Sequence, residues 1–280
     1  MQKSFHITGA VRLDIQLTAG EIEIDAGPTD RVEVELVAHD AESQQLVDAA
    51  RVELHQADGR SEVVVDVPAR PKSWSLGSLR RQSITCRVSC PPGSDLRTRT
   101  RSAGVRARGE LGEVDVATAS GDVAVEDARG ALSLKSASGD LTARSVGGRA
   151  TANTASGDVA IESVTGDLAA NTASGDIRIG SVGGDVKANS ASGDTTIGAV
   201  RAGAVSVNAA SGDVHIGIRR GSRVHLDCST VSGEARSELD LGADEPEGDG
   251  PFVDLKARTA SGDITITRAP ATADVHAVQA

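Results

Sequence analysis

The sequence predicts an all-β protein, a single-stranded β-solenoid (β-helix) with coils of about 18 residues. Three observations carry this prediction: Ser-Gly-Asp recurs at a fixed interval, apolar residues alternate between the glycines, and aromatic residues are almost absent. The 280 residues include two Phe, one Trp and no Tyr, although 39% of them are hydrophobic. The interior must therefore consist of Val, Ala, Ile and Leu, which suit the narrow core of stacked coils.

The repeat dominates the second half of the chain. Glycines recur every nine residues from Gly112 to Gly193, and the first four Ser-Gly-Asp intervals are 18 residues long, so each coil has two similar halves. A variant with Glu in place of Asp begins at Ser232. Ser-Gly-Asp itself begins at Ser120, Ser138, Ser156, Ser174, Ser192, Ser211 and Ser261.

Each half of a coil has the pattern of a short strand. The second and fourth residues after Gly are apolar, as in Val159 and Ile161, and this period of two excludes a helix. The seventh residue is Val in one half and Ala in the other, which predicts one wide and one narrow corner. Stacked coils about 4.8 Å apart align equivalent residues in ladders. We expect side-chain amide hydrogen bonds along the ladder of Asn153, Asn171, Asn189 and Asn208.

Residues 1–100 lack the glycine period but keep strand-like alternation, for example from Val11 to Leu17. We predict that they start and cap the solenoid, because an uncapped stack would expose strand edges. One short helix is expected over Ala41 to Ala50, with Asp40 as its N-cap. The segment from Pro68 to Ser83 has the composition of a loop.

Residues 101–268 are assigned to the solenoid repeats. An acidic insertion at 241–251 interrupts them and is expected to be a loop extruded from one coil, after which the repeat resumes at Phe252. Residues 269–280 are expected to form a flexible tail.

Composition narrows the range of partners. The formal net charge of −11 argues against nucleic acid and anionic membrane surfaces, since both are themselves anionic. Three Cys cannot form a disulfide framework, and no apolar run is long enough to insert in a membrane. We expect a cytoplasmic protein that requires no cofactor and whose partner is another protein.

The strongest candidate site is a row of carboxylates that follow the repeat glycines, for which two hypotheses remain open. The row binds metal cations such as Ca²⁺, which prefer several oxygen ligands, or each Asp accepts hydrogen bonds from backbone N–H groups and the neighbouring Ser in its own turn. At the opposite turn the equivalent positions hold Glu113, Ala131, Arg149, Asp167, Asp185 and Ala204, so Asp is not required there. The candidate row consists of Asp122, Asp140, Asp158, Asp176, Asp194 and Asp213.

Other reactive residues favour structural roles. Cys86 and Cys90 lie four residues apart on a predicted strand, about 13 Å from each other, and are expected to be buried thiols, as is Cys228. His215 and His225 lack a partner at metal-ligand spacing, and the repeat serines lack the G-x-S-x-G turn of a nucleophile. A group of arginines could dock an acidic partner or pair with the acidic insertion: Arg97, Arg99, Arg101, Arg106 and Arg108.

The TASGD and SASGD units, the preceding segment CPPGSDLRTRTRSAG and the β-rich N-terminal stretch resemble a bacterial β-strand repeat family called putative adhesin, or toastrack. The resemblance covers roughly residues 5–268. It implies a solenoid-like fold without known catalytic residues. It also implies a context, since some members are joined to membrane segments or found with envelope-stress proteins.

Three functions of different classes follow. The favoured one is a non-enzymatic protein-interaction or scaffold module that presents its surface within an envelope-stress or regulatory complex. The alternatives are a self-polymerising, cytoskeletal-type β-helix scaffold that associates end to end, and a cation-binding adhesin. A carbohydrate-active β-helix enzyme is disfavoured, because the coils are short and aromatic residues for sugar stacking are almost absent.

Overall fold

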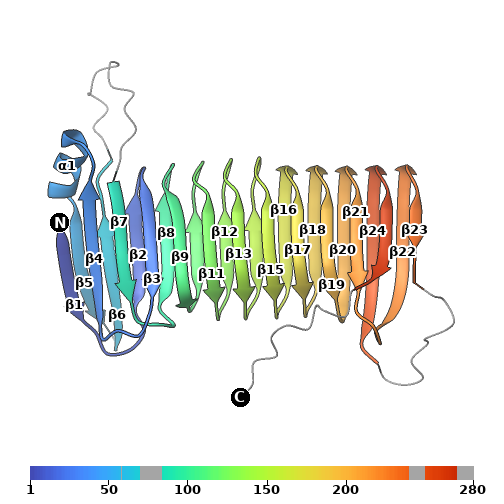
Figure 1. Ribbon diagram of the computed structural model, residues 1–280, viewed down its shortest axis with the longest axis horizontal. Helices are drawn as coiled ribbons and strands as arrows, with labels where there is room; N and C mark the ends of the chain where they lie inside the picture. Colours follow the sequence, from blue (N-terminus) through green and yellow to red (C-terminus); the bar gives the residue numbers. More distant parts are fainter. Residues whose placement is uncertain (58, 70–83, 240–249, 270–280) are drawn as a thin grey trace. The chain divides into compact units, whose positions relative to one another are not determined.

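The computed structural model describes residues 1–57, 59–69, 84–239 and 250–269. The chain forms two compact units, residues 1–143 (unit 1) and 144–280 (unit 2), and in each unit strands are stacked in two sheets (Figure 1). The β-solenoid prediction is confirmed, and the number of sheets, which the sequence left open, is two. The expected loop at 68–83 and the tail at 269–280 fall almost entirely outside the described residues.

Unit 1 begins with strands that depart from the repeat. β1 pairs with β4, β4 with β7 and β5 with β6, all antiparallel, whereas the strands that follow pair in parallel. The first sheet has the order β1 (Gln2–His6), β4 (Arg31–Ala38), β7 (Ile84–Cys90), β3 (Glu21–Ala26), β9 (Gly104–Leu111), β11 (Val123–Ala128). The second has the order β5 (Arg51–Ala57), β6 (Arg60–Asp66), β2 (Arg12–Leu17), β8 (Asp95–Thr100), β10 (Val114–Ala117), β12 (Leu132–Lys135). β13 (Leu141–Val146) spans the boundary between the units.

The predicted helix is present as α1 (Ala41–Asp48) and contacts β4. The Asp40 Oδ1 atom accepts a hydrogen bond from the Ser43 backbone N–H at 2.7 Å, so Asp40 is the N-cap, as predicted. The Lys3 ammonium group donates to the Val52 carbonyl at 2.8 Å and thereby connects β1 to β5. Antiparallel strands, a helix and this contact together close the N-terminal edges of the two sheets in unit 1.

All strand pairs within unit 2 are parallel and follow the repeat. Ile161 pairs with Ile179 and Asn153 with Asn171, a register of 18 residues per coil. The first sheet has the order β15 (Val159–Val164), β17 (Ile177–Val182), β19 (Thr195–Val200), β21 (Val214–Ile218), β25 (Ile264–Arg268), β23 (Ala235–Ser237). The second has the order β14 (Ala150–Asn153), β16 (Leu168–Ser174), β18 (Val186–Ser192), β20 (Gly203–Ser211), β24 (Phe252–Ser261), β22 (Arg223–Ser232).

The last coils do not stack in the order of the sequence. Ser261 pairs with both Ser211 and Ser232, so the β24–β25 coil lies between the β20–β21 coil and the β22–β23 coil. In the chain, the acidic insertion falls between β23 and β24, and most of it lies outside the described residues. The expectation of a loop extruded from one coil stays a prediction.

Side-chain polarity explains this inversion. In the first sheet β25 contributes Ile264 and Ile266, each 1% exposed, whereas the equivalent residues of β23 are the exposed Ala235 and Ser237. Burying an isoleucine contributes about 1.5–3 kcal/mol. The coil with the larger apolar residues is thus enclosed, and the polar coil lies at the end.

The predicted asparagine ladder is present in unit 2. The Nδ2 groups of Asn171 and Asn189 each donate to the Oδ1 atom of the preceding asparagine at 2.7 Å, and Asn208 donates to Asn189 at 3.1 Å. Each amide hydrogen-bonds to its equivalent in the next coil, so the ladder stabilises the stacking of coils.

Candidate functional site

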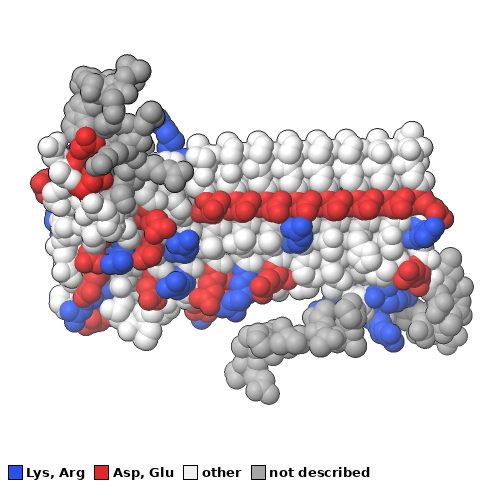
Figure 2. All heavy atoms as spheres, turned by 45° about the horizontal axis from the view of Figure 1, so that its top comes forward, with Lys and Arg blue, Asp and Glu red and all other residues white. Residues whose placement is uncertain are grey.

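The carboxylate row lies at the turn that leads from the second sheet to the first. In unit 2 the Asp158 Oδ1 atom accepts a hydrogen bond from the Asp176 backbone N–H at 2.9 Å, and Asp176 accepts one from Asp194 in the same way. The series continues along the row, where Asp194, Asp213 and Asp263 each accept a hydrogen bond at Oδ1 from the backbone N–H of the next member. The last member is Glu234, and the N···O distances are 2.8–2.9 Å. Figure 2 shows these acidic side chains as a red row. In unit 1 the Asp140 backbone N–H donates to the Asp122 Oδ1 atom at 3.1 Å.

These contacts refine the turn hypothesis. The donor is the backbone of the next coil rather than the residue's own turn or its neighbouring serine, because stacking places an equivalent N–H one strand spacing away. Among the described residues there is no group of three or more His, Cys, Asp or Glu side chains placed to hold a metal ion. Metal binding by this row stays a prediction.

Glycine is required at this turn because the coils approach closely. Gly212 has a φ of +122°, and a Cβ atom added there would lie 2.3 Å from the Gly193 carbonyl oxygen. No side chain fits in that space, so the glycine lets each Asp come within hydrogen-bond distance of the next coil.

The charges of the row are only partly neutralised. The Arg178 guanidinium group donates to the Oδ2 atoms of both Asp158 and Asp176. The hydrogen bond from Arg236, supplemented by its positive charge, lowers the pKa of Glu234. Among the described residues no cationic side chain forms an ion pair with three members of the row: Asp194, Asp213 and Asp263.

Small exposed side chains lie beside the row, and the inward position predicted for some of them from the sequence is wrong. The alanines expected at a narrow inner corner, such as Ala155 and Ala173, face solvent together with the serine that follows each. The residue one position earlier is buried instead, as in Thr154 and Thr172, each 7% exposed. The Thr172 hydroxyl donates to the Gly157 carbonyl at 3.4 Å. The hydroxyl of Ser190, the equivalent residue of the next coil, is buried without a hydrogen-bond partner among the described residues.

The opposite turn contains the same hydrogen bond wherever Asp occurs. The Asp185 backbone N–H donates to Asp167 Oδ1 at 3.2 Å, and the Ala204 N–H donates to Asp185 Oδ1 at 2.8 Å. A hydrogen bond from Arg149, together with the backbone contact to Asp185, lowers the pKa of the Asp167 carboxyl. The opposite turn thus has the same local geometry without an unbroken acidic row.

The arginine group lies in unit 1, and two of its five members form ion pairs with described residues on the sheet surface. Arg99 forms an ion pair with Asp115 at 2.7 Å, and Arg106 forms one with Glu21 at 3.2 Å. Arg97 and Arg101 are exposed. Pairing with the acidic insertion cannot be assessed, because residues 240–249 fall outside the described residues.

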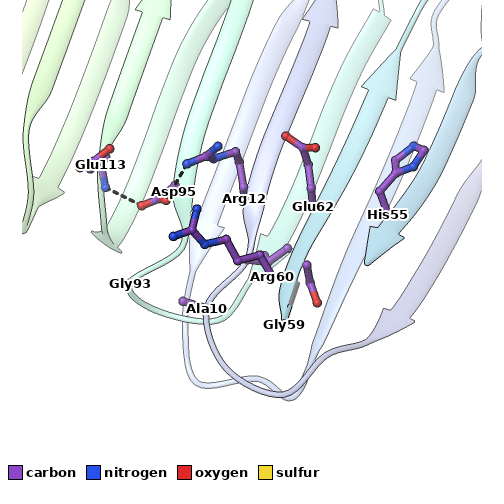
Figure 3. A pocket seen from close by; sticks show the side chains of 11 residues that line it. Ala10, Arg12, His55, Gly59, Arg60, Glu62, Gly93, Asp95 and Glu113 are labelled. Atoms are coloured by element: carbon purple, nitrogen blue, oxygen red, sulfur yellow. Dashed lines mark hydrogen bonds and ion pairs between the residues drawn. The ribbon is translucent and has the colours of Figure 1, made fainter. Parts of the chain in front are cut away.

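A groove of about 570 Å³ in unit 1 is lined by side chains of both charges (Figure 3). The Arg12 guanidinium group lies 3.7 Å from the Asp95 carboxylate, whose other oxygen accepts the Glu113 backbone N–H at 2.8 Å. Arg60, His55 and Glu62 complete the polar lining. Two arginines and three carboxylates line the groove, so it presents both charges to a ligand.

The cysteine predictions are largely confirmed. Cys86 and Cys90 are buried free thiols, and Cys228 is half-buried. Burial raises the pKa of Cys86 to about 12 and that of Cys90 to about 11. His215 contacts Thr267 at 3.4 Å, and His225 lies opposite Asp254 in the register of β22 and β24.

The solved structures that the chain is similar to at low sequence identity include bacterial proteins. A putative lipid binding protein from Parabacteroides distasonis ATCC 8503 shares 12% identity, with a TM-score of 0.49 and 96% of each chain covered. A putative adhesin from Bacteroides fragilis NCTC 9343 shares 11% identity, with a TM-score of 0.43 and 96% of each chain covered. No curated protein matches the chain.

No helix among the described residues is long and apolar enough to cross a membrane. The profile of the family described as Toastrack DUF4097 matches residues 10–267, nearly the whole repeat and its N-terminal cap. The chain therefore belongs to the Toastrack DUF4097 family.

Proposed function

We propose that this toastrack domain is a non-enzymatic protein-interaction module that binds a basic protein surface along its acidic row. The observation that carries the proposal is the charge of Asp194, Asp213 and Asp263, three adjacent carboxylates that form no ion pair among the described residues, although the positive charge of Arg236 also acts on Asp263. Each uses one oxygen to hold the next coil, which leaves Oδ2 available to a ligand.

The neighbouring surface supports the same proposal. On the second-sheet side of the row, the exposed side chains next to these carboxylates are Ala and Ser, which are short and uncharged. On the first-sheet side, the exposed Thr196 and His215 lie two residues after Asp194 and Asp213. An approaching lysine or arginine therefore has its freest approach from the second-sheet side. Coils spaced about 4.8 Å apart present charges at regular intervals, so several cations on one partner can bind at once. The adhesin-like and envelope-stress roles implied by the family resemblance are specific forms of this proposal.

The test uses a substitution that removes charge without removing the structural hydrogen bond. In the triple variant Asp194→Asn, Asp213→Asn and Asp263→Asn, each amide oxygen can still accept the backbone N–H of the next coil. Wild type and variant are compared as immobilised baits in bacterial lysate, with bound proteins identified by mass spectrometry. Partners are then titrated by calorimetry at two salt concentrations.

The matched control is Asp167→Asn with Asp185→Asn, which makes the same chemical change at the opposite turn. We expect the triple variant to lose basic partners, the control to retain them, and added salt to weaken binding. Partners captured equally by all three proteins would contradict the role of the acidic row.

A further inference from the structure

The outer edge of β22 is the open end of the second sheet in unit 2. Among the described residues, β22 pairs only with β24. Its inward-facing Val224 and Leu226 are half-buried, whereas the residues that pair with them one coil further in, Val253 and Leu255, are 0% exposed. In the described part of the chain, nothing covers the outer backbone hydrogen-bonding groups of β22 or the end of the core beside it.

We propose that this edge pairs with a second copy of the chain, β22 against β22 and antiparallel, about a two-fold axis perpendicular to the sheets. An unpaired strand edge presents backbone N–H and C=O groups that another strand satisfies directly. A two-fold axis makes the two strands antiparallel and lets one surface serve both copies.

The side chains of β22 are self-complementary in this arrangement. Pairing centred on Leu226 places that residue against the partner's Leu226 and sets His225 opposite the partner's Asp227. Arg223 then faces the partner's Ser229, so no two cations and no two anions are directly opposite. The inward-facing apolar residues of the two copies meet and continue the core.

The terminal strands of unit 1 do not favour head-to-tail association. In unit 1 the terminal strands β1 and β5 belong to antiparallel pairs, and a Lys3 contact to Val52 connects them. They do not present the parallel repeat that would extend the stack. The interface uses the edge of β22 and not the acidic row, so the test of the dimer is independent of the test of the proposed function.

The test is sedimentation velocity of the full chain over a wide concentration range. We expect a monomer–dimer equilibrium in wild type. In Leu226→Lys we expect association to be at least about tenfold weaker, because two ammonium groups would meet at the two-fold axis. Phe5→Lys on β1 is the matched control, since Phe5 is also half-buried on an edge strand. It should leave the dimer intact.

A second measurement does not depend on the stability of the lysine variant. In Leu226→Cys with Cys228→Ser, mild oxidation should produce a covalent dimer, because residues on the two-fold axis of an antiparallel pair are close enough for a disulfide. Thr265→Cys with Cys228→Ser, on an enclosed coil, should form no covalent dimer. A wild type that is monomeric at every concentration, a dimer abolished by Phe5→Lys alone, or no covalent dimer from Leu226→Cys would each overturn the proposal.

Discussion

The Asp213 Oδ1 atom accepts a hydrogen bond from the Asp263 backbone N–H at 2.8 Å, although 50 residues separate the two in the chain. Equivalent contacts from Asp158 to Asp213 join residues 18 or 19 apart. The long separation arises because the chain forms the β22–β23 coil before it returns to fill the position beside β20 and β21. The hydrogen bond itself is unchanged. Whether a coil joins the ladder therefore depends on its local structure and not on its place in the sequence.

The inverted order of the last coils predicts a specific disulfide. Ser211→Cys with Ser261→Cys should form an intramolecular bond, because adjacent coils in register lie about 4.8 Å apart. Ser211→Cys with Ser232→Cys should not, since two coil spacings, about 9.6 Å, exceed the reach of a disulfide. Mass spectrometry after oxidation distinguishes them, and bonding only in the second pair would show sequential stacking.

Close approach at the row predicts unequal costs of two glycine substitutions. Gly212→Ala should destabilise the protein by about 2–4 kcal/mol, because its Cβ meets the Gly193 carbonyl and its φ is positive. Gly221→Ala also has a positive φ, +81°, but no atom within 4 Å, and should cost about 1 kcal/mol. Denaturant unfolding compares them, and equal losses would contradict the steric explanation.

The asparagine ladder predicts a dependence on position. Asn171 donates to Asn153 and accepts from Asn189, so Asn171→Ala breaks two hydrogen bonds and should cost about 2 kcal/mol. Asn208→Ala removes one bond from an exposed residue and should cost about half as much. The midpoint of thermal unfolding measures both. A greater loss for Asn208→Ala would argue against cooperative stacking of the amides.

The buried thiols predict loss of stability at alkaline pH. Burial raises the pKa of Cys86 to about 12 and of Cys90 to about 11, against about 8.5 in an unfolded chain. Below pH 8.5 both states keep the protons. As pH rises toward the folded values, the unfolded state releases protons first, and the free energy of unfolding falls by about 2 kcal/mol per thiol at pH 10.

Denaturant titrations at pH 8 and pH 10 check this expectation, with Cys86→Ala and Cys90→Ala as the control. The double variant starts from lower stability but should lose less of it between the two pH values. The absence of Tyr from the chain removes one other group that titrates in this range. An identical alkaline loss in wild type and variant would assign the effect to other groups.

The sequence by itself determined the coil. The glycine period, the alternation of apolar residues and the asparagine positions depend on local stereochemistry and on the identity of neighbouring coils, which a repeat displays directly. The helix after Asp40 was predictable for the same reason, because an N-cap acts over one turn. These features became visible without knowledge of any distant contact.

Only the tertiary structure decided how the coils are ordered and which edges are open. Burial of Ile264 and Ile266 in place of Ala235 and Ser237 depends on a comparison between coils that are separate in the chain. Likewise, the outward direction of Ala173 and the burial of Thr172 depend on the path of the turn, because both residues are small and periodicity does not distinguish them. The local residue pattern specifies the structure of one coil. Competition between coils for burial of their apolar side chains specifies the place of each coil in the stack.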